Sequence, residues 1–187
     1  MKRSNKRNDT SSVLERRLGD AKKRDNVREL VLDIILTAVV VYILFGVLLG
    51  LSIARGDSMS PNVKSGDLML FCRVGNTYHK EDVIIMHNGM GDDYVKRVLG
   101  TEGDTVAINN KTGRLVVNGE ELTEENIYTE TYSKEQGIDF PITLAKGQLF
   151  VLGDNRKVSK DSREFGVIQN RQVAGKVIFT TRMWKKI

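Results

Sequence analysis

The chain has 187 residues and a net charge of +5, and 40% of its residues are hydrophobic. This length fits one domain of ordinary size with additional segments and is sufficient to bury a hydrophobic core. The single cysteine, Cys72, excludes an intramolecular disulfide. The excess positive charge is local, because residues 1–30 carry ten Lys/Arg and five Asp/Glu whereas the remainder is balanced.

The basic N-terminal segment has two interpretations, a nucleic-acid patch or a signal for membrane topology. The next segment favours the second, because residues 34–54 contain no charged side chain over 21 positions. About 20 apolar residues cross the hydrocarbon core as a helix, whereas a cleaved signal peptide has a shorter apolar stretch. The sequence therefore predicts one membrane span over residues 33–54 and no nucleic-acid partner.

Residues 1–32 are predicted to lie in the cytoplasm, because basic residues accumulate before the span and only Arg55 follows it closely. Residues 1–12 are polar and predicted to be disordered. Residues 13–32 mix apolar and charged positions. They form either a helix along the membrane surface or a solvated helix, and both interpretations stay open.

Residues 55–187 are predicted to form an extracytoplasmic domain rich in β-strands. Short runs of Val, Ile, Leu and Phe alternate with turn signals such as Asn-Gly and Gly-Asp. A loop at residues 109–113 between two such runs predicts a hairpin. Residues 120–140 are acidic and irregular, and predict an excursion from the β body. The predicted strands are 68–74, 83–87, 94–98, 105–109, 114–117, 148–152 and 176–181.

Ser58 stands where the apolar segment stops and the polar domain starts. A serine needs a base to become a nucleophile, and His79 and His87 both lie in polar turn contexts. Lysine is the other candidate base, provided that burial lowers its pKa enough to make it neutral. Strand alternation would turn Lys96 into an apolar layer together with Tyr94. A surface lysine at a strand edge is the alternative reading of the same pattern.

A third candidate segment, residues 153–166, follows an apolar strand directly and is dense in ionic side chains. Such a loop is normally a solvated turn. It could instead hold internal Asp–Arg pairs and supply a serine hydroxyl that orients a lysine.

These segments, in this order, resemble the bacterial type I signal peptidase family. The resemblance is carried by Ser-Met-Ser-Pro at 58–61, Gly-Asp-Leu-Met at 66–69, the lysine segment at 94–104 and Gly-Asp-Asn-Arg through Asp-Ser-Arg at 153–163. Four ordered motifs over residues 30–182 are specific. The family implies a mainly β fold, a compact antiparallel β-barrel-like catalytic domain of the signal peptidase/LexA type, after one transmembrane helix.

The resemblance also implies roles for individual residues. Ser58 would be the nucleophile, Lys96 the general base, and Ser159 the partner that fixes the amine of Lys96. Asp161 and Arg163 would pair and hold the loop, with Asp154 and Arg156 beside them. The residues implied to line the pockets for small substrate side chains are Met59, Val63, Tyr94 and Val95. No cofactor and no metal are implied.

Some positions depart from the better-known form of the family. Gly56 replaces a serine that supplies an oxyanion donor, which resembles the Gram-positive form and leaves the second donor unassigned. Asn62 and Val63 replace the usual Thr-Leu, and Thr101 and Glu102 replace a more apolar pair.

The resemblance implies a membrane serine endopeptidase that removes signal peptides from exported preproteins after small residues, through an acyl-enzyme. Its partners would be secretory preproteins, the lipid bilayer and the secretion translocon, and its location the plasma membrane with the N-terminus in the cytoplasm. The alternatives are an idle or specialised relative that serves one dedicated substrate, such as a pilin, and a LexA-type self-cleaving regulator. The span argues against the regulator, because that class is soluble.

Overall fold

The computed structural model describes residues 23, 26–75, 77–87, 93–124, 127 and 129–182. The chain divides into two compact units, Met1–Gly46 and Val47–Ile187. The disorder predicted for residues 1–12, and the first part of the helix predicted at 13–32, lie outside the described residues.

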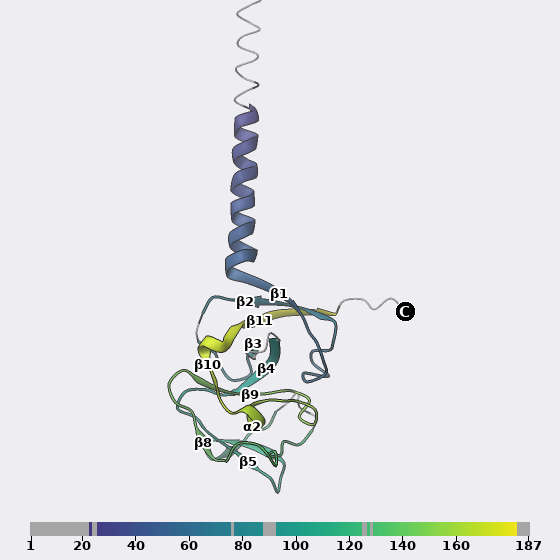
Figure 1. Ribbon diagram of the computed structural model, residues 1–187, viewed down its shortest axis with the longest axis vertical. Coiled ribbons are helices and arrows are strands. Elements are labelled where there is room, and N and C mark those ends of the chain that lie inside the picture. The colour runs from purple at the N-terminus through teal and green to yellow at the C-terminus, as the bar shows by residue number, and fades with distance from the viewer. Residues whose placement is uncertain are drawn as a thin grey trace, which may run out of the picture. The chain divides into compact units, whose positions relative to one another are not determined.

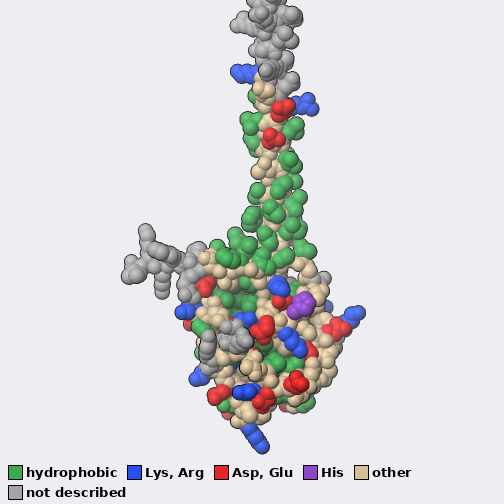
Figure 2. Space-filling view, turned by 180° about the vertical axis from the view of Figure 1, so that it is seen from behind, with side chains coloured by type: hydrophobic (Ala, Val, Ile, Leu, Met, Phe, Trp, Pro, Cys, Tyr) green, Lys and Arg blue, Asp and Glu red, His purple; other side chains and the backbone are tan. Residues whose placement is uncertain are grey.

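Among the described residues, one helix is long and apolar enough to cross a membrane, Asn26–Leu48. Its last six residues, Ile43–Leu48, form the π-helix η1. Hydrophobic side chains cover most of its surface (Figure 2), and the large ones from Val27 to Val47 are all exposed. A helix that is apolar on every side is typical of a lipid-facing span.

The helix ends earlier than the sequence predicted. Residues Leu49–Ile53 form strand β1 rather than the last turns of a helix reaching Ala54. They pair antiparallel with the next strand, from Leu49 opposite Cys72 to Ile53 opposite Leu68. Gly50 is required here, because a Cβ at this position would overlap the Phe71 ring. A continuous apolar run does not distinguish a strand from a helix, so the pattern could not reveal this change.

The larger sheet has seven antiparallel strands in the order β1-β2-β11-β3-β4-β9-β10, and it curls on itself (Figure 1). Register shifts interrupt the pairing of β11 with both neighbours and of β4 with β9. Such irregularities bend a strand and increase its twist, which allows the sheet to curve. Its other strands are β2 (Asp67–Cys72), β3 (Val83–His87), β4 (Asp93–Gly100), β9 (Gln148–Leu152), β10 (Ile168–Gln169) and β11 (Val173–Arg182).

A smaller sheet has four antiparallel strands in the order β7-β6-β5-β8. The predicted hairpin is present, and Gly113 ends its loop at a φ of 64°, which favours glycine. The seven predicted strands are all confirmed, and the mainly β, barrel-like fold with them. The four strands are β5 (Thr105–Asn109), β6 (Arg114–Val117), β7 (Glu120–Glu121) and β8 (Ile142–Thr143).

Strand β4 is at the centre of the packing. Val98 and Leu99 point to opposite faces and belong to two different hydrophobic clusters, one with Ile84 and Val151 and one with the smaller sheet. A third cluster lies under the loop that follows β1. Its buried members are Ala54, Met59, Val63, Met69, Phe71 and Ile85.

Candidate active site

The loop after β1 holds Ser58 at the surface of the third cluster. Met59 and Val63 are 3% and 5% exposed, so they fix the loop on the sheet while Ser58 stays half-buried. The backbone N–H of Val63 donates to the Met59 carbonyl at 2.9 Å, which closes the turn. Gly56 has a φ of 76°, a conformation that favours glycine. The local fold thus explains why Gly56 precedes Ser58.

Lys96 lies on β4 and is 2% exposed. Its Nζ donates to Ser58 Oγ at 3.0 Å and to the Val95 carbonyl at 3.0 Å. Burial lowers the pKa of Lys96 to about 8, against the opposing pull of Asp161 and Asp154. About one lysine in ten is then neutral at pH 7, compared with fewer than one in a thousand at the ordinary pKa. The pair has the geometry of a hydroxyl beside a partly neutral amine.

The loop that follows β9 closes against both residues. The Asn155 backbone N–H donates to the Ser58 carbonyl at 2.9 Å. A Cβ on Gly153 would overlap Ser159 Oγ and crowd the Ser58 carbonyl, so only glycine fits there. Ser159 is 1% exposed, and its Oγ has no hydrogen-bond partner. The bond expected from Ser159 to Lys96 is therefore not formed; the amine of Lys96 donates to Ser58 and Val95.

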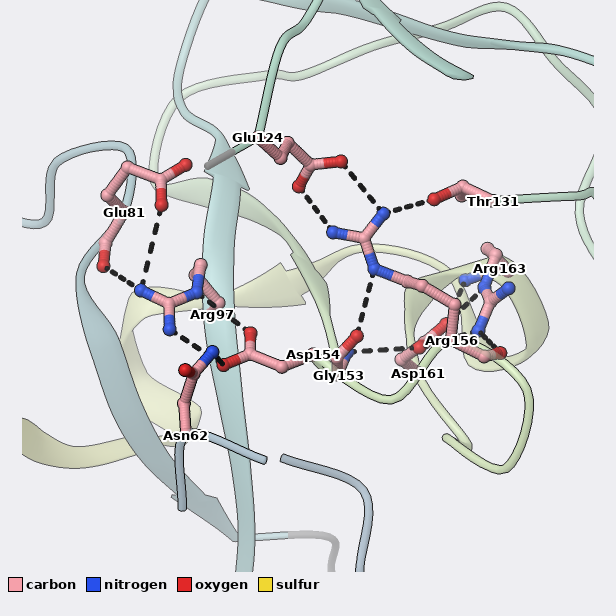
Figure 3. Close-up of polar contacts among 10 residues, drawn as sticks. All are labelled: Asn62, Glu81, Arg97, Glu124, Thr131, Gly153, Asp154, Arg156, Asp161 and Arg163. Carbon is pink, nitrogen blue, oxygen red and sulfur yellow. Dashed lines mark hydrogen bonds and ion pairs between the residues drawn. The ribbon is translucent and has the colours of Figure 1, made fainter. Parts of the chain in front are cut away.

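Asp161 and Arg163 form a buried ion pair inside this loop (Figure 3). Arg163 donates from Nε and Nη2 to the two carboxylate oxygens at 2.9 and 3.0 Å. The Gly153 N–H also donates to Asp161 Oδ2 at 3.1 Å. Asp161 in addition caps the short helix α2 (Ser162–Phe165). The charged side chains of this loop are therefore buried and paired, unlike those of a solvated turn.

A second carboxylate, Asp154, joins three segments that are far apart in sequence (Figure 3). Its oxygens accept from Arg97 Nε at 2.8 Å and Nη2 at 2.7 Å, and from Asn62 Nδ2 at 2.8 Å. The hydrogen bond with Asp154 raises the pKa of Arg97. Asp154 thus links the loop that holds Ser58 to strand β4, which holds Lys96. Sequence reasoning missed Arg97 and Asn62, and only the adjacency of Arg97 to Lys96 gave a signal.

A third buried charge, Arg156, connects the loop to the acidic excursion (Figure 3). Arg156 is 1% exposed, and its guanidinium forms a bidentate pair with Glu124 and a hydrogen bond with Thr131. Its Nε donates to the Gly153 carbonyl at 2.9 Å. Arg163 Nη1 also donates to the Tyr132 carbonyl at 3.3 Å. Residues 120–140, for which no role was predicted, therefore contact and stabilise the loop that follows β9.

Two cavities lie beside the loop that holds Ser58, and Ser58 itself lines one of them. The strand groove, of about 710 Å³, lies between β1 and the start of β4, and is lined by Leu51, Ser52, Ile53, Arg55, Gly56, Leu68, Asp93, Tyr94 and Val95. The serine cavity, of about 620 Å³, is lined by Arg55, Gly56, Asp57, Ser58, Ser60, Tyr94, Lys96, Asn155, Val158 and Lys160.

The strand groove has an unpaired strand edge on each side. Strand β1 pairs only with β2, and residues 93–96 of β4 pair only with β3 within the described sheet. Of the predicted substrate-binding residues, Tyr94 and Val95 line this groove. Met59 and Val63 line neither cavity, because they are buried against the third cluster. No cluster of His, Cys, Asp or Glu among the described residues could hold a metal ion.

Comparison with known proteins identifies the family. The model of the family described as "Signal peptidase, peptidase S26" matches residues 27–184. The chain belongs to the signal peptidase family. It is 34% identical over 178 residues to signal peptidase IB of Staphylococcus aureus strain COL, covering 86% of this chain and 91% of that one. It is 35% identical over 148 residues to signal peptidase I of Bacillus caldolyticus, covering 71% and 78%.

A solved structure of a signal peptidase I from Enterococcus faecalis V583 aligns with 55% of this chain and 97% of its own, with a TM-score of 0.45 and 28% sequence identity. The two sequence relatives named above come from Gram-positive bacteria, in line with the Gram-positive form that Gly56 indicated.

Proposed function

We propose that this chain is a membrane-anchored endopeptidase that removes signal peptides from exported preproteins after small residues. One observation carries the proposal: the buried amine of Lys96 donates to Ser58 Oγ at 3.0 Å beside a groove with two unpaired strand edges. The family supplies the substrate class, since its members are signal peptidases.

In the proposed reaction, Ser58 Oγ attacks the carbonyl carbon of the scissile bond while Lys96 takes the hydroxyl proton. The Ser58 backbone N–H stabilises the oxyanion. The C–N bond then breaks, and Lys96 returns the proton to the departing amine. A water activated by the same amine hydrolyses the acyl-enzyme, which frees Ser58 and the carboxyl end of the signal peptide.

The substrate would bind as an added strand in the strand groove. An extended peptide between β1 and residues 93–96 forms main-chain hydrogen bonds with both edges. These hydrogen bonds do not depend on the side chains of the peptide. Specificity then comes from the pockets for alternate side chains. Tyr94 and Val95 line the groove, so the space that they leave for these side chains would set the preference for small residues.

The helix Asn26–Leu48 would anchor the enzyme in the plasma membrane. The basic residues before it place the N-terminal segment in the cytoplasm and the β domain outside. The proposal keeps the three-part division of the chain, with the helix of the span ending at Leu48. Tethering keeps the site near the bilayer, where the apolar segment of the preprotein resides, and so raises the effective concentration.

The test is cleavage of a model preprotein by the full-length chain in detergent micelles. Ser58→Ala and Lys96→Ala are each expected to lower kcat by about 10⁴-fold or more. Ser65→Ala and Lys64→Ala are matched controls, since both side chains are exposed in the adjacent turn. Full activity in either dyad variant would refute the mechanism, and no cleavage by the wild-type chain would favour an idle relative.

A further inference from the structure

The serine cavity differs in its charge from the strand groove. It has two basic side chains at its rim, Arg55 and Lys160, and one acidic side chain, Asp57. Arg55 is exposed. Lys160 pairs only with Glu164, at 3.4 Å, and both side chains are largely exposed. Such surface pairs are weak, so Lys160 is free to contact a bound peptide.

The direction of a bound peptide follows from the two cavities, and this step rests on the proposed function. They meet at Gly56 and Tyr94 and share the wall that contains Arg55. Residues before the scissile bond occupy the strand groove, because that groove has an unpaired strand edge on each side. The substrate residues after the scissile bond therefore enter the serine cavity, whose lining includes Asn155 and Val158.

We propose that the serine cavity binds the first residues of the mature protein and selects acidic side chains at the second and third positions after the cleavage site. With Lys96 neutral, Arg55 and Lys160 outweigh Asp57 by one positive charge. Exposed charges a few ångströms apart interact modestly in water. Exchanging an acidic for a basic residue at one position is therefore expected to change kcat/KM by about three- to tenfold.

The test measures kcat/KM of the full-length chain in uncharged detergent for two peptides with the same signal segment and the same residue on each side of the scissile bond. One peptide has Glu at the second and third mature positions, and the other has Lys. Lys160→Glu reverses one charge at the rim of the serine cavity. Lys157→Glu is the matched control, because Lys157 is exposed in the same loop but does not line the cavity.

The wild-type chain should prefer the acidic peptide by at least about threefold at low salt, and 0.5 M NaCl should remove most of this preference. Lys160→Glu should abolish or invert it, whereas Lys157→Glu should leave it unchanged. Equal rates for the two peptides, or an equal effect of both variants, would overturn the subsite while leaving the peptidase assignment intact. Failure to cleave either peptide would overturn both.

Discussion

Replacement of Lys96 by Met should make the protein inactive and more stable. Burial lowers the pKa of Lys96 from 10.5 to about 8, so the folded protein holds this proton less tightly than the unfolded chain. A pKa that is lowered by one pH unit corresponds to about 1.4 kcal/mol. The charged form of buried Lys96 therefore costs about 3 kcal/mol of stability below pH 8. Met keeps the apolar volume and removes the charge, at the loss of the hydrogen bonds with Ser58 and Val95.

The net gain expected at pH 7 is therefore about 1 kcal/mol, since each of the two lost hydrogen bonds offsets about 1 kcal/mol. The difference has a defined pH dependence. Between pH 8 and 10.5 the unfolded wild-type chain binds a proton that the folded one does not, so wild-type stability rises with pH. The advantage of Lys96→Met should fall through this range, reach zero at about pH 9, and become a deficit of about 2 kcal/mol near pH 10.5.

The assay is urea unfolding of the full-length chain in micelles, followed by circular dichroism at pH 7, 8, 9 and 10. Groups elsewhere cancel when wild type and variant are compared at the same pH. Lys146→Met is the control, because this lysine is exposed and its replacement should change the free energy of unfolding by less than about 0.5 kcal/mol. If Lys96→Met is less stable than the wild type at pH 7, or if the difference in stability stays constant from pH 7 to 10, burial of the charged Lys96 does not destabilise the protein.

Two further changes separate positioning from stability. Ser159→Ala removes a buried hydroxyl without a partner, so the free energy of unfolding should stay level or rise by about 1 kcal/mol. If Ser159 orients the amine of Lys96 in the substrate complex, kcat should nevertheless fall at least tenfold, and an unchanged kcat would remove Ser159 from the mechanism. Glu124→Ala leaves the buried guanidinium of Arg156 without its carboxylate and should cost about 3–5 kcal/mol in urea unfolding. Glu130→Ala, at an exposed position of the same excursion, should change stability by less than about 0.5 kcal/mol, and equal losses in both variants would contradict the assigned support.

Much of the β domain was predictable, because alternation and turn residues are local signals. Strand alternation left two interpretations of Lys96 open, a buried lysine and a surface lysine, and only the folded structure decides for burial. The ion pair between Asp161 and Arg163 was also accessible, because the two residues are separated by one position.

Contacts between distant segments could not be predicted in this way. Asn62 contacts Asp154 across 92 positions and Glu124 contacts Arg156 across 32, and neither pairing leaves a periodic trace. The strand β1 was hidden for a different reason. An apolar run that follows a membrane span continues its hydropathy pattern, and only the pairing of β1 with β2 determines that it is extended.

The pH dependence of kcat/KM for preprotein cleavage tests the central claim most directly, because it reports the protonation of the free enzyme. Lys96 acts as a base only when neutral, so kcat/KM should rise about tenfold per pH unit below pH 8 and level off above it. A rate that does not change between pH 6 and 8, or a limb that appears only near pH 10.5, would contradict a buried, partly neutral Lys96 as the base for Ser58.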